Sequence, residues 1–340
     1  MTLINTQCRL AARPVGLPKP SDWEVVDEPA GSPADGEFLV RVEYLSVDPA
    51  MRTWMNAGRS YVPAVEIGEV MRAGGIGRVI DSRNPDFEVG DEVYGMFGVQ
   101  RYALSDGDGV TPVDTTLAPA PVHLGALGGS GLTAYFGLLD VGRPQPGQTV
   151  VVSGAAGSVG NIAGQIARIN GCRAIGIAGG ADKCRWLVEE LGFDAAIDYK
   201  AGDLRAQLKT HAPNGIDVFF DNVGGEALEA ALSRLARGAR VVICGAVSQY
   251  NATGERRGPA NYMQLLVARA SMTGFVVFDY VDRYPEAVAQ LANWLRSGEL
   301  RSREQVIHGD VGDFPEVLLA LFRGHNTGKL VLALDPGIGL

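Results

Sequence analysis

One short segment constrains the fold of this chain more than any other. Residues 150–160 read VVVSGAAGSVG, with small and branched apolar residues that indicate a buried strand and a GAAG run that indicates a tight turn. Apolar residues then recur at helical spacing at positions 159, 162, 163, 166, 167 and 169. Strand, glycine turn and helix together indicate dinucleotide binding, because the helix start offers unpaired N–H groups to a pyrophosphate that only small residues let approach. The spacing GxxGxxG differs from the commoner GxGxxG, so a plain glycine turn of another α/β protein stays open as the alternative.

Strands and helices alternate on both sides of this segment, from about residue 125 to residue 298. The expected strands are Thr149–Ser153, Arg173–Ala178, Ala195–Asp198, Asp217–Asn222, Ala239–Cys244 and Met272–Val277. The expected helices are Ser158–Asn170, Ala181–Leu191, Gly225–Leu235 and Pro259–Arg269. Such alternation predicts an α/β fold with a Rossmann-type, doubly wound parallel sheet.

The rest of the chain reads differently. Before residue 125, short strands such as Phe38–Leu45, Gly77–Ile80 and Asp91–Met96 are separated by Gly, Pro and Asp, which predicts a mostly β, barrel-like domain. After residue 298 come a strand near 305–308, a helix near 315–323 and a final strand at 329–334. A lone strand needs a sheet to join, so this segment is expected to return to the first domain. The predicted domains are therefore 1–124 with 299–340, and 125–298.

Net charge and cysteine content limit which binding partners and which cellular compartment we expect for this protein. The 340 residues carry a formal net charge of −9 without a long basic run, which disfavours nucleic acid and anionic membranes as partners. The four cysteines form no C-x-x-C pair, which is typical of a reduced intracellular protein. No signal peptide is evident at the N-terminus. We therefore expect a cytoplasmic enzyme that acts on a small molecule.

Several further segments, taken together, resemble one known family. They are YLSVDPAMR at 44–52, GLTAY at 131–135, FDNVGG at 220–225, ICGAVSQYN at 243–251 and GHNTGK at 324–329. With the glycine turn, they resemble the zinc-independent medium-chain dehydrogenases/reductases, and among these the NADP-dependent alkenal double-bond reductases, also called prostaglandin reductases or leukotriene hydroxydehydrogenases. The resemblance implies a GroES-like barrel domain beside the Rossmann domain. At Ala50 and near Val267 the chain departs from relatives that carry tyrosine.

The residue types argue against a metal centre. Zinc-dependent alcohol dehydrogenases of this superfamily use Cys and His ligands for catalytic zinc and four closely spaced Cys for structural zinc. Here no Cys lies between Cys8 and Cys172, and Glu69 follows Gly68 without a His beside it. The four histidines show no ligand spacing. We therefore expect no metal.

The choice of cofactor can be argued from the end of the second Rossmann strand. An NAD site usually places an acid there to bind the ribose diol, whereas this strand is followed by Gly179-Gly180. The resemblance assigns a 2′-phosphate contact to Lys183, with Tyr199 and Asn222 nearby, which implies NADPH/NADP. The alternative is a solvated Lys183 and a ribose bound by Asp182. The other expected cofactor-binding residues are Thr133, Ala155, Ala156, Gly157, Ser158, Val159, Cys244, Gly245, Ala246, Ser248, Tyr250, Phe275, Val276, Val277 and Asn326.

Metal-free reduction of a conjugated carbonyl needs a donor to the developing oxyanion, and a tyrosine hydroxyl or the cofactor ribose can serve. The candidates are Tyr61, Tyr250 and Tyr262, of which the resemblance favours the first two as catalytic residues at a cleft; Tyr262 reads equally well as a packing residue. The expected activity is NADPH-dependent reduction of the C=C bond of α,β-unsaturated ketones and aldehydes, with hydride going to the β-carbon. Two alternatives stay open: a quinone or carbonyl reductase, and an NADPH-binding sensor or structural protein with little turnover.

The apolar stretch MTGFVVF at 272–278 bears on assembly. As an exposed edge strand it would invite pairing with a second copy, and relatives join their sheets at this place. It therefore predicts a homodimer formed through the dinucleotide-binding domain. A buried central strand is the alternative interpretation.

Overall fold

A computed structural model describes residues 3–255 and 258–335 of the chain. It divides into two units: Met1–Leu124 with Glu304–Leu340, and Gly125–Arg303. The chain thus leaves the first unit once and returns to it once. The second crossing lies at residue 303, and the sequence had suggested residue 298. Each unit is described by itself below.

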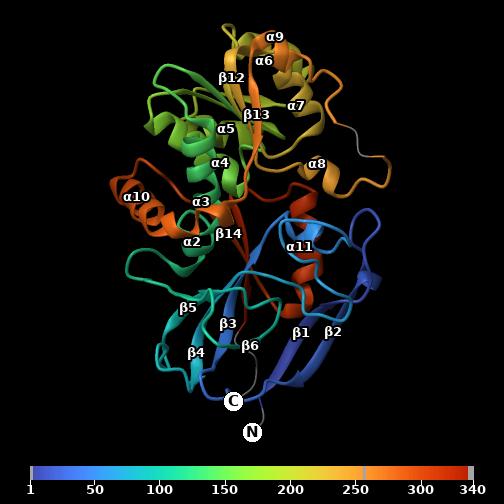
Figure 1. Cartoon of the computed structure of the whole chain (residues 1–340), viewed down its shortest axis with the longest axis vertical. Helices are drawn as coiled ribbons and strands as arrows, with labels where there is room; N and C mark the ends of the chain where they lie inside the picture. The colour runs from blue at the N-terminus through green and yellow to red at the C-terminus, as the bar shows by residue number, and fades with distance from the viewer. Residues whose placement is uncertain (1–2, 256–257, 336–340) are drawn as a thin grey trace. The chain divides into compact units, whose positions relative to one another are not determined.

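The second unit is built on a six-stranded sheet in which every neighbouring pair is parallel. Its strand order is β10-β9-β8-β11-β12-β13, the 3-2-1-4-5-6 order of a Rossmann fold. Figure 1 shows the sheet between its helices. The strands are β8 (Thr149–Ser153), β9 (Arg173–Ala178), β10 (Ala195–Asp198), β11 (Ile216–Asp221), β12 (Leu235–Ile243) and β13 (Ser271–Gly274).

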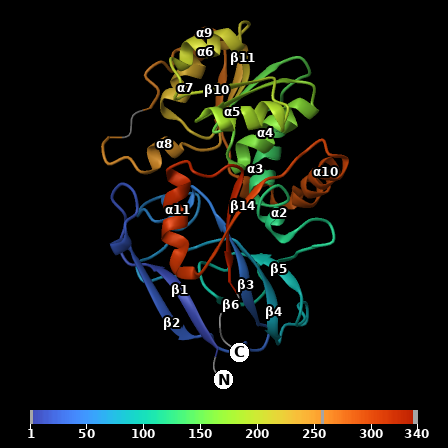
Figure 2. The same cartoon turned by 180° about the vertical axis from the view of Figure 1, so that it is seen from behind.

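Helices cover both faces of this sheet, with α4 and α5 on one side and α6, α7 and α9 on the other (Figures 1 and 2). The helices of the unit are α3 (Gly129–Phe136), α4 (Ser158–Ile169), α5 (Ala181–Glu189), α6 (Leu204–His211), α7 (Gly225–Leu232), α8 (Val247–Tyr250), α9 (Gln264–Ala268) and α10 (Tyr284–Ser297), with the π-helix η2 (Gly137–Gly142) and the 3₁₀ helix η3 (Val277–Arg283). Within the described residues, no helix has both the length and the apolar character needed to cross a membrane.

Apolar side chains of the sheet pack against the helices that cover it. Val151, Ile175, Phe219 and Val241 are buried in one cluster with the apolar faces of α6 and α7. Such a sheet has both faces covered, so its strands need apolar residues at nearly every position. This explains why β8 and β9 read as continuous apolar runs.

The first unit is mostly β. Its seven-stranded sheet has the order β14-β15-β3-β4-β5-β7, with β6 also paired to β3, and β1 and β2 form a separate antiparallel pair. Its strands are β1 (Ile4–Leu10), β2 (Trp23–Pro29), β3 (Phe38–Val47), β4 (Gly75–Ser82), β5 (Glu92–Gly95), β6 (Tyr102–Ser105), β7 (Thr111–Pro112), β14 (Glu304–Gly309) and β15 (Lys329–Leu334). Its helices and turns are η1 (Pro20–Asp22), α1 (Met51–Trp54), α2 (Ala120–Leu124), η4 (Val311–Asp313) and α11 (Phe314–Phe322).

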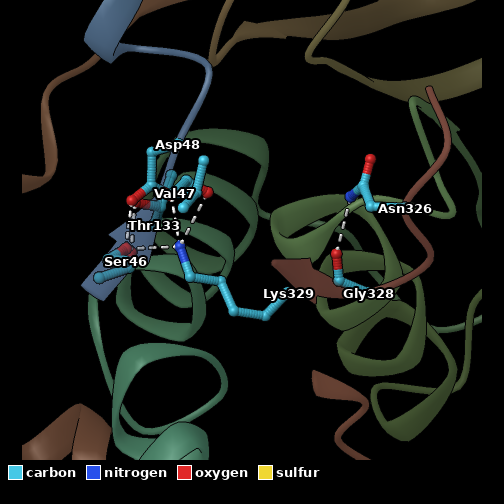
Figure 3. A network of polar contacts seen from close by, with 8 residues as sticks. Ser46, Val47, Asp48, Thr133, Asn326, Gly328 and Lys329 are labelled. Carbon is cyan, nitrogen blue, oxygen red and sulfur yellow. Dashed lines mark hydrogen bonds and ion pairs between the residues drawn. The ribbon is translucent and has the colours of Figure 1, made fainter. Parts of the chain in front are cut away.

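The C-terminal strand β15 lies inside this sheet, between β14 and β3, as expected for a strand that needs a sheet to join. An ion pair between the buried Lys329 and the partly exposed Asp48 also ties its first residue to the end of β3. Lys329, whose side chain is 2% exposed, donates from Nζ to Asp48 Oδ1 at 2.6 Å and to Ser46 Oγ at 2.6 Å (Figure 3). Ser46 Oγ in turn donates to Asp48 Oδ2. Each polar atom of this buried cluster thus has a partner, which offsets the cost of burying the charge.

Most expected elements are present, and several differ in extent, among them the three that follow. The helix expected at Pro259–Arg269 is only Gln264–Ala268, and it ends where Arg269 adopts a positive φ of 52°. The strand expected to reach Val277 ends at Gly274 and is followed by a 3₁₀ turn that begins at Val277. The helix expected to reach Leu235 ends at Leu232, because Leu235 already begins strand β12.

Candidate active site

Most of the expected cofactor-binding residues of the second unit follow the carboxyl ends of its parallel strands. Residues 155–159 follow β8, Lys183 follows β9, Tyr199 follows β10 and Asn222 follows β11. Residues 244–250 follow β12, and residues 275–277 follow β13. Because all six strands are parallel, these residues share one edge of the sheet, where open α/β sheets bind ligands. The fold therefore gathers residues that lie more than a hundred positions apart in the sequence.

The turn after β8 is built so that only small residues fit. Gly154 has a φ of +59° and accepts a backbone hydrogen bond from Gly157 at 3.0 Å. A Cβ atom on Gly160 would lie 2.3 Å from the carbonyl oxygen of Gly154, and one on Gly157 would lie 3.2 Å from it. The spacing GxxGxxG is thus required by the close packing of helix α4 on the turn.

Helix α4 begins at Ser158 without a side chain that caps it, since its N-cap residue is Gly157. The first N–H groups of a helix need acceptors, and an uncapped start presents them to an anion together with the positive end of the dipole. Ala155 and Ala156 beside it are buried and add little bulk. This cradle therefore fits the pyrophosphate of a dinucleotide.

A buried polar network holds the neighbouring loop in place. Asp221, fully buried at the end of β11, accepts hydrogen bonds from Ser153 Oγ at 2.6 Å and from the backbone of Val223 and Gly224 at 3.0 Å each. Asn222 donates from Nδ2 to the Ser153 carbonyl at 2.7 Å. Burial raises the pKa of the Asp221 carboxyl, an effect that these hydrogen bonds oppose. Sequence reasoning gave no role to Asp221, because nothing in the sequence marks its side chain as facing Ser153.

Two glycines, Gly179 and Gly180, stand at the end of β9, where an NAD site usually places an acid. A Cβ atom on Gly179 would lie 2.8 Å from Cε1 of Tyr199 and 3.0 Å from Cε of Lys200. Gly180 has a φ of +103°, which side chains rarely adopt, and its N–H donates to Asp198 Oδ1 at 2.9 Å. Neither position therefore carries a carboxylate, and a side chain at Gly180 would be strained.

Two lysines, Lys183 and Lys200, lie near the end of β9. Burial, with a further contribution from the charge of Lys200, lowers the pKa of Lys183. The Lys200 ammonium lies 5.8 Å from the ring centroid of Tyr199. Asp182, the alternative ribose ligand, is exposed and pairs with Arg185 at 3.2 Å. The chemistry of this corner fits a phosphate on the ribose.

Tyr250 lies on α8, beyond the end of β12. Its hydroxyl oxygen accepts a hydrogen bond from the backbone N–H of Ala246 at 3.3 Å, and a Cβ atom on Gly245 would lie 2.9 Å from it. Burial, assisted by Asp221, raises the pKa of the nearby Cys244 thiol to about 12. A thiol of that kind is neutral at pH 7, so Cys244 is no ready metal ligand or nucleophile.

The remaining expected residues lie elsewhere. Thr133 is on α3 and donates to the Gly129 carbonyl at 2.6 Å. Asn326 and Tyr61 belong to the first unit. Asn326 is buried and donates to the Gly328 carbonyl at 3.1 Å, next to the buried Lys329 (Figure 3). Tyr262 is exposed.

No cluster of three or more His, Cys, Asp or Glu side chains able to hold a metal ion occurs in residues 3–255 and 258–335. The chain nevertheless matches a family whose description mentions zinc. Residues 158–293 match the family described as zinc-binding dehydrogenase, and residues 6–113 match the one described as N-terminal domain of oxidoreductase.

Similar proteins cover nearly the whole chain. An NADPH-dependent curcumin reductase of Escherichia coli (strain K12) is 40% identical over 333 residues, with 96% of each chain covered. A 2-alkenal reductase (NADP(+)-dependent) of Nicotiana tabacum is 37% identical, with 97% of this chain and 98% of the relative covered. The crystal structure of CurA in complex with NADPH from Vibrio vulnificus superposes with a TM-score of 0.92 at 42% identity, covering 98% of this chain and 100% of that one. With its Rossmann sheet, its glycine turn and these relatives, the chain belongs to the NADP-dependent alkenal and prostaglandin reductases of the medium-chain dehydrogenase/reductase family.

Proposed function

We propose that this protein uses NADPH to reduce the C=C bond of α,β-unsaturated ketones and aldehydes. Its family membership supports an NADP-dependent oxidoreductase, and the names of its relatives include alkenal, curcumin and prostaglandin reductases. The observation that carries the proposal furthest is the corner at Gly179 and Lys183, where glycines replace the acid of an NAD site and where Lys183 feels the charge of Lys200.

The proposed cofactor site lies at the carboxyl ends of the parallel strands of the second unit. In this proposal the pyrophosphate lies on the uncapped start of α4 at residues 155–159, and Lys183 and Tyr199 contact the 2′-phosphate. Asn222, residues 244–248 and residues 275–277 line the rest of the cofactor, with Thr133 and Asn326. When bound, NADPH supplies the hydride for the reaction.

Two tyrosines complete the chemistry. Reduction of a conjugated carbonyl at its β-carbon places negative charge on the carbonyl oxygen, and a preorganised hydroxyl lowers the barrier by donating to it. We assign this role to Tyr61 and Tyr250. The hydroxyl oxygen of each accepts a hydrogen bond, from Trp54 Nε1 at 3.3 Å and from the Ala246 N–H at 3.3 Å, which orients its own proton toward another acceptor. The cofactor ribose hydroxyl is the other donor that can serve.

A substrate panel with product identification tests the proposal. Purified protein is assayed by NADPH oxidation with enals, enones and quinones, and each product is identified by mass spectrometry and NMR. We expect a saturated ketone or aldehyde. Turnover of quinones alone, or formation of an allylic alcohol, would identify a quinone or carbonyl reductase. Tight NADPH binding without turnover on any substrate would identify a binding protein.

We also propose a homodimer formed through the second unit, and a cytoplasmic location. Strand β13 is an edge strand whose four residues are all exposed, and an unpaired edge invites strand pairing. Exposed apolar side chains gather in the same part of the chain, at Tyr262, Met263, Leu266, Val267, Met272 and Phe278. The location rests on the four cysteines, all of which are free.

A further inference from the structure

The loop that carries Tyr61 is closed by the residues at its base. It follows helix α1, and the Val65 N–H donates to the Trp54 carbonyl at 2.8 Å. Arg13 donates from Nη1 to the carbonyls of Met55, at 2.8 Å, and Val65, at 2.9 Å. Both ends of the loop are therefore tied to the body of the first unit, although Tyr61 itself is 51% exposed.

One side chain of the core reaches Tyr61 directly. Trp54 is 8% exposed and packs in the core of the first unit, and its indole Nε1 donates to the Tyr61 hydroxyl oxygen at 3.3 Å. The indole ring is supported by Arg72, whose guanidinium carbon lies 5.8 Å from the ring centroid. Arg72 also donates from Nη1 to the Pro63 carbonyl at 2.8 Å. The same arginine thus steadies the tryptophan ring and the loop beside Tyr61.

The direction of the Trp54 contact is fixed by chemistry. The indole N–H is a donor only, so the tyrosine oxygen must be the acceptor. An O–H group whose oxygen accepts a hydrogen bond is polarised and becomes a stronger donor. The bond also restricts rotation of the phenol, so that its proton points away from the indole.

From this geometry we propose that Trp54 is a positioning residue that orients Tyr61 and strengthens its hydroxyl as a donor to the substrate carbonyl. The inference rests on the role proposed for Tyr61 above. It adds a residue that is 8% exposed and packs in the core of the first unit.

The central variant is Trp54→Phe, which removes the indole N–H and keeps an aromatic ring. Loss of one hydrogen bond is expected to lower kcat on a good enone roughly two- to tenfold, while the Kd for NADPH stays within error. In a Tyr61→Phe background the same change is expected to have no further effect, since the two residues act through one bond. The matched control is Trp23→Phe, a tryptophan of the same unit that is 9% exposed and packs edge-on against Phe314. It is expected to leave kcat unchanged.

A second readout is independent of turnover. The chain has four tryptophans, so a ¹⁵N-labelled sample gives four indole N–H signals, and the one missing in Trp54→Phe belongs to Trp54. That signal is expected to shift upfield in Tyr61→Phe, where its acceptor is gone, and the other three are expected to stay in place. Should Trp54→Phe fail to fold, Arg72→Met replaces it, and is expected to lower kcat with Tyr61 present but not in the Tyr61→Phe background.

The outcomes separate the two proposals. Wild-type turnover in Tyr61→Phe would refute the role of Tyr61, and the indole signal would still report whether the contact exists. A lower turnover in Tyr61→Phe, combined with wild-type turnover in Trp54→Phe or with multiplied effects in the double variant, would overturn the positioning role alone. An unshifted indole signal in Tyr61→Phe would overturn it as well.

Discussion

At the scale of single residues, we propose that the charge of Lys183 decides the choice between the two nicotinamide cofactors. A charge-assisted contact to a phosphate is worth about 1.5–3 kcal/mol, so Lys183→Ala is expected to weaken NADPH binding tenfold or more. NADH binding is expected to stay the same, because NADH has no 2′-phosphate. Isothermal titration with both cofactors measures the change, and Lys209→Ala, an exposed lysine of α6, is the control. An equal loss for both cofactors would assign Lys183 to the fold instead.

The pH dependence of binding follows from the same lysine. Burial and then Lys200 lower the pKa of Lys183, so the side chain loses its proton at a lower pH than an ordinary lysine does. A contact to phosphate needs the protonated form. NADPH affinity is therefore expected to fall as the pH rises through this lowered pKa, while NADH affinity stays flat. A flat NADPH profile that matches the NADH profile would contradict the assignment.

Residue types and the family resemblance predicted the kind of cofactor, whereas the position of each site residue stays a prediction. The glycine turn and the missing acid after Ala178 are local signals, because backbone approach and strand ends are set by neighbours in the sequence. Trp54 and Asp221 were not singled out. Their roles come from contacts with Tyr61 and Ser153 that depend on how a loop closes or on which strand lies alongside, and neither leaves a pattern in one sequence.

At the scale of elements, the packing of α4 on the glycine turn gives a stability test. Gly160→Ala places a Cβ atom 2.3 Å from the Gly154 carbonyl oxygen, a contact with backbone that cannot move freely. The free energy of unfolding is expected to fall by about 1–3 kcal/mol, as measured by urea denaturation. Gly129→Ala is the matched control, since nothing lies within 4 Å of its added Cβ, and it is expected to be neutral or slightly stabilising. Equal stability of the two variants would show that the turn relaxes.

The edge strand gives a second test at this scale. Met272→Asp places a charge on β13, and charges on an edge oppose strand pairing. Light scattering at micromolar concentration is expected to show a dimer for the wild type and a monomer for this variant, with NADPH still bound. Val89→Asp, which changes an exposed valine of the first unit in the same way, is expected to stay dimeric. A monomeric wild type would refute the proposed dimer.

Elements with a strong periodic pattern were predicted to within a residue or two, and β8, β9, β10 and β15 match their expected bounds. The alternative of a central position for the 272–278 stretch is wrong, because β13 lies at the edge of the sheet. Short helices were less predictable. The backbone at Arg269 turns left-handed although its sequence neighbourhood is helical, since the chain must turn there into β13.

At the scale of the whole molecule, the distribution of ligand-type residues predicts chemistry without a metal. No cluster of three or more potential metal ligands exists in the part of the chain that the structure describes. We expect elemental analysis of the purified protein to find no stoichiometric zinc, and turnover to be unchanged after dialysis against a chelator. One tightly held metal per chain, with activity lost on its removal, would contradict this expectation.

The place of β15 has a consequence for biosynthesis. This strand joins β14 to β3, yet it is made after every other strand that the structure describes, and its Lys329 binds Asp48 across 281 positions. While the ribosome is still translating, residues 125–303 already hold all six strands of their own sheet and can fold as they emerge. Residues 1–124 emerge before β15 is made, so the side of β3 that pairs with β15 stays exposed until then. The nascent chain is therefore expected to depend on chaperones that bind residues 1–124. A premature stop before β15 would leave this N-terminal region as a substrate for quality-control proteases.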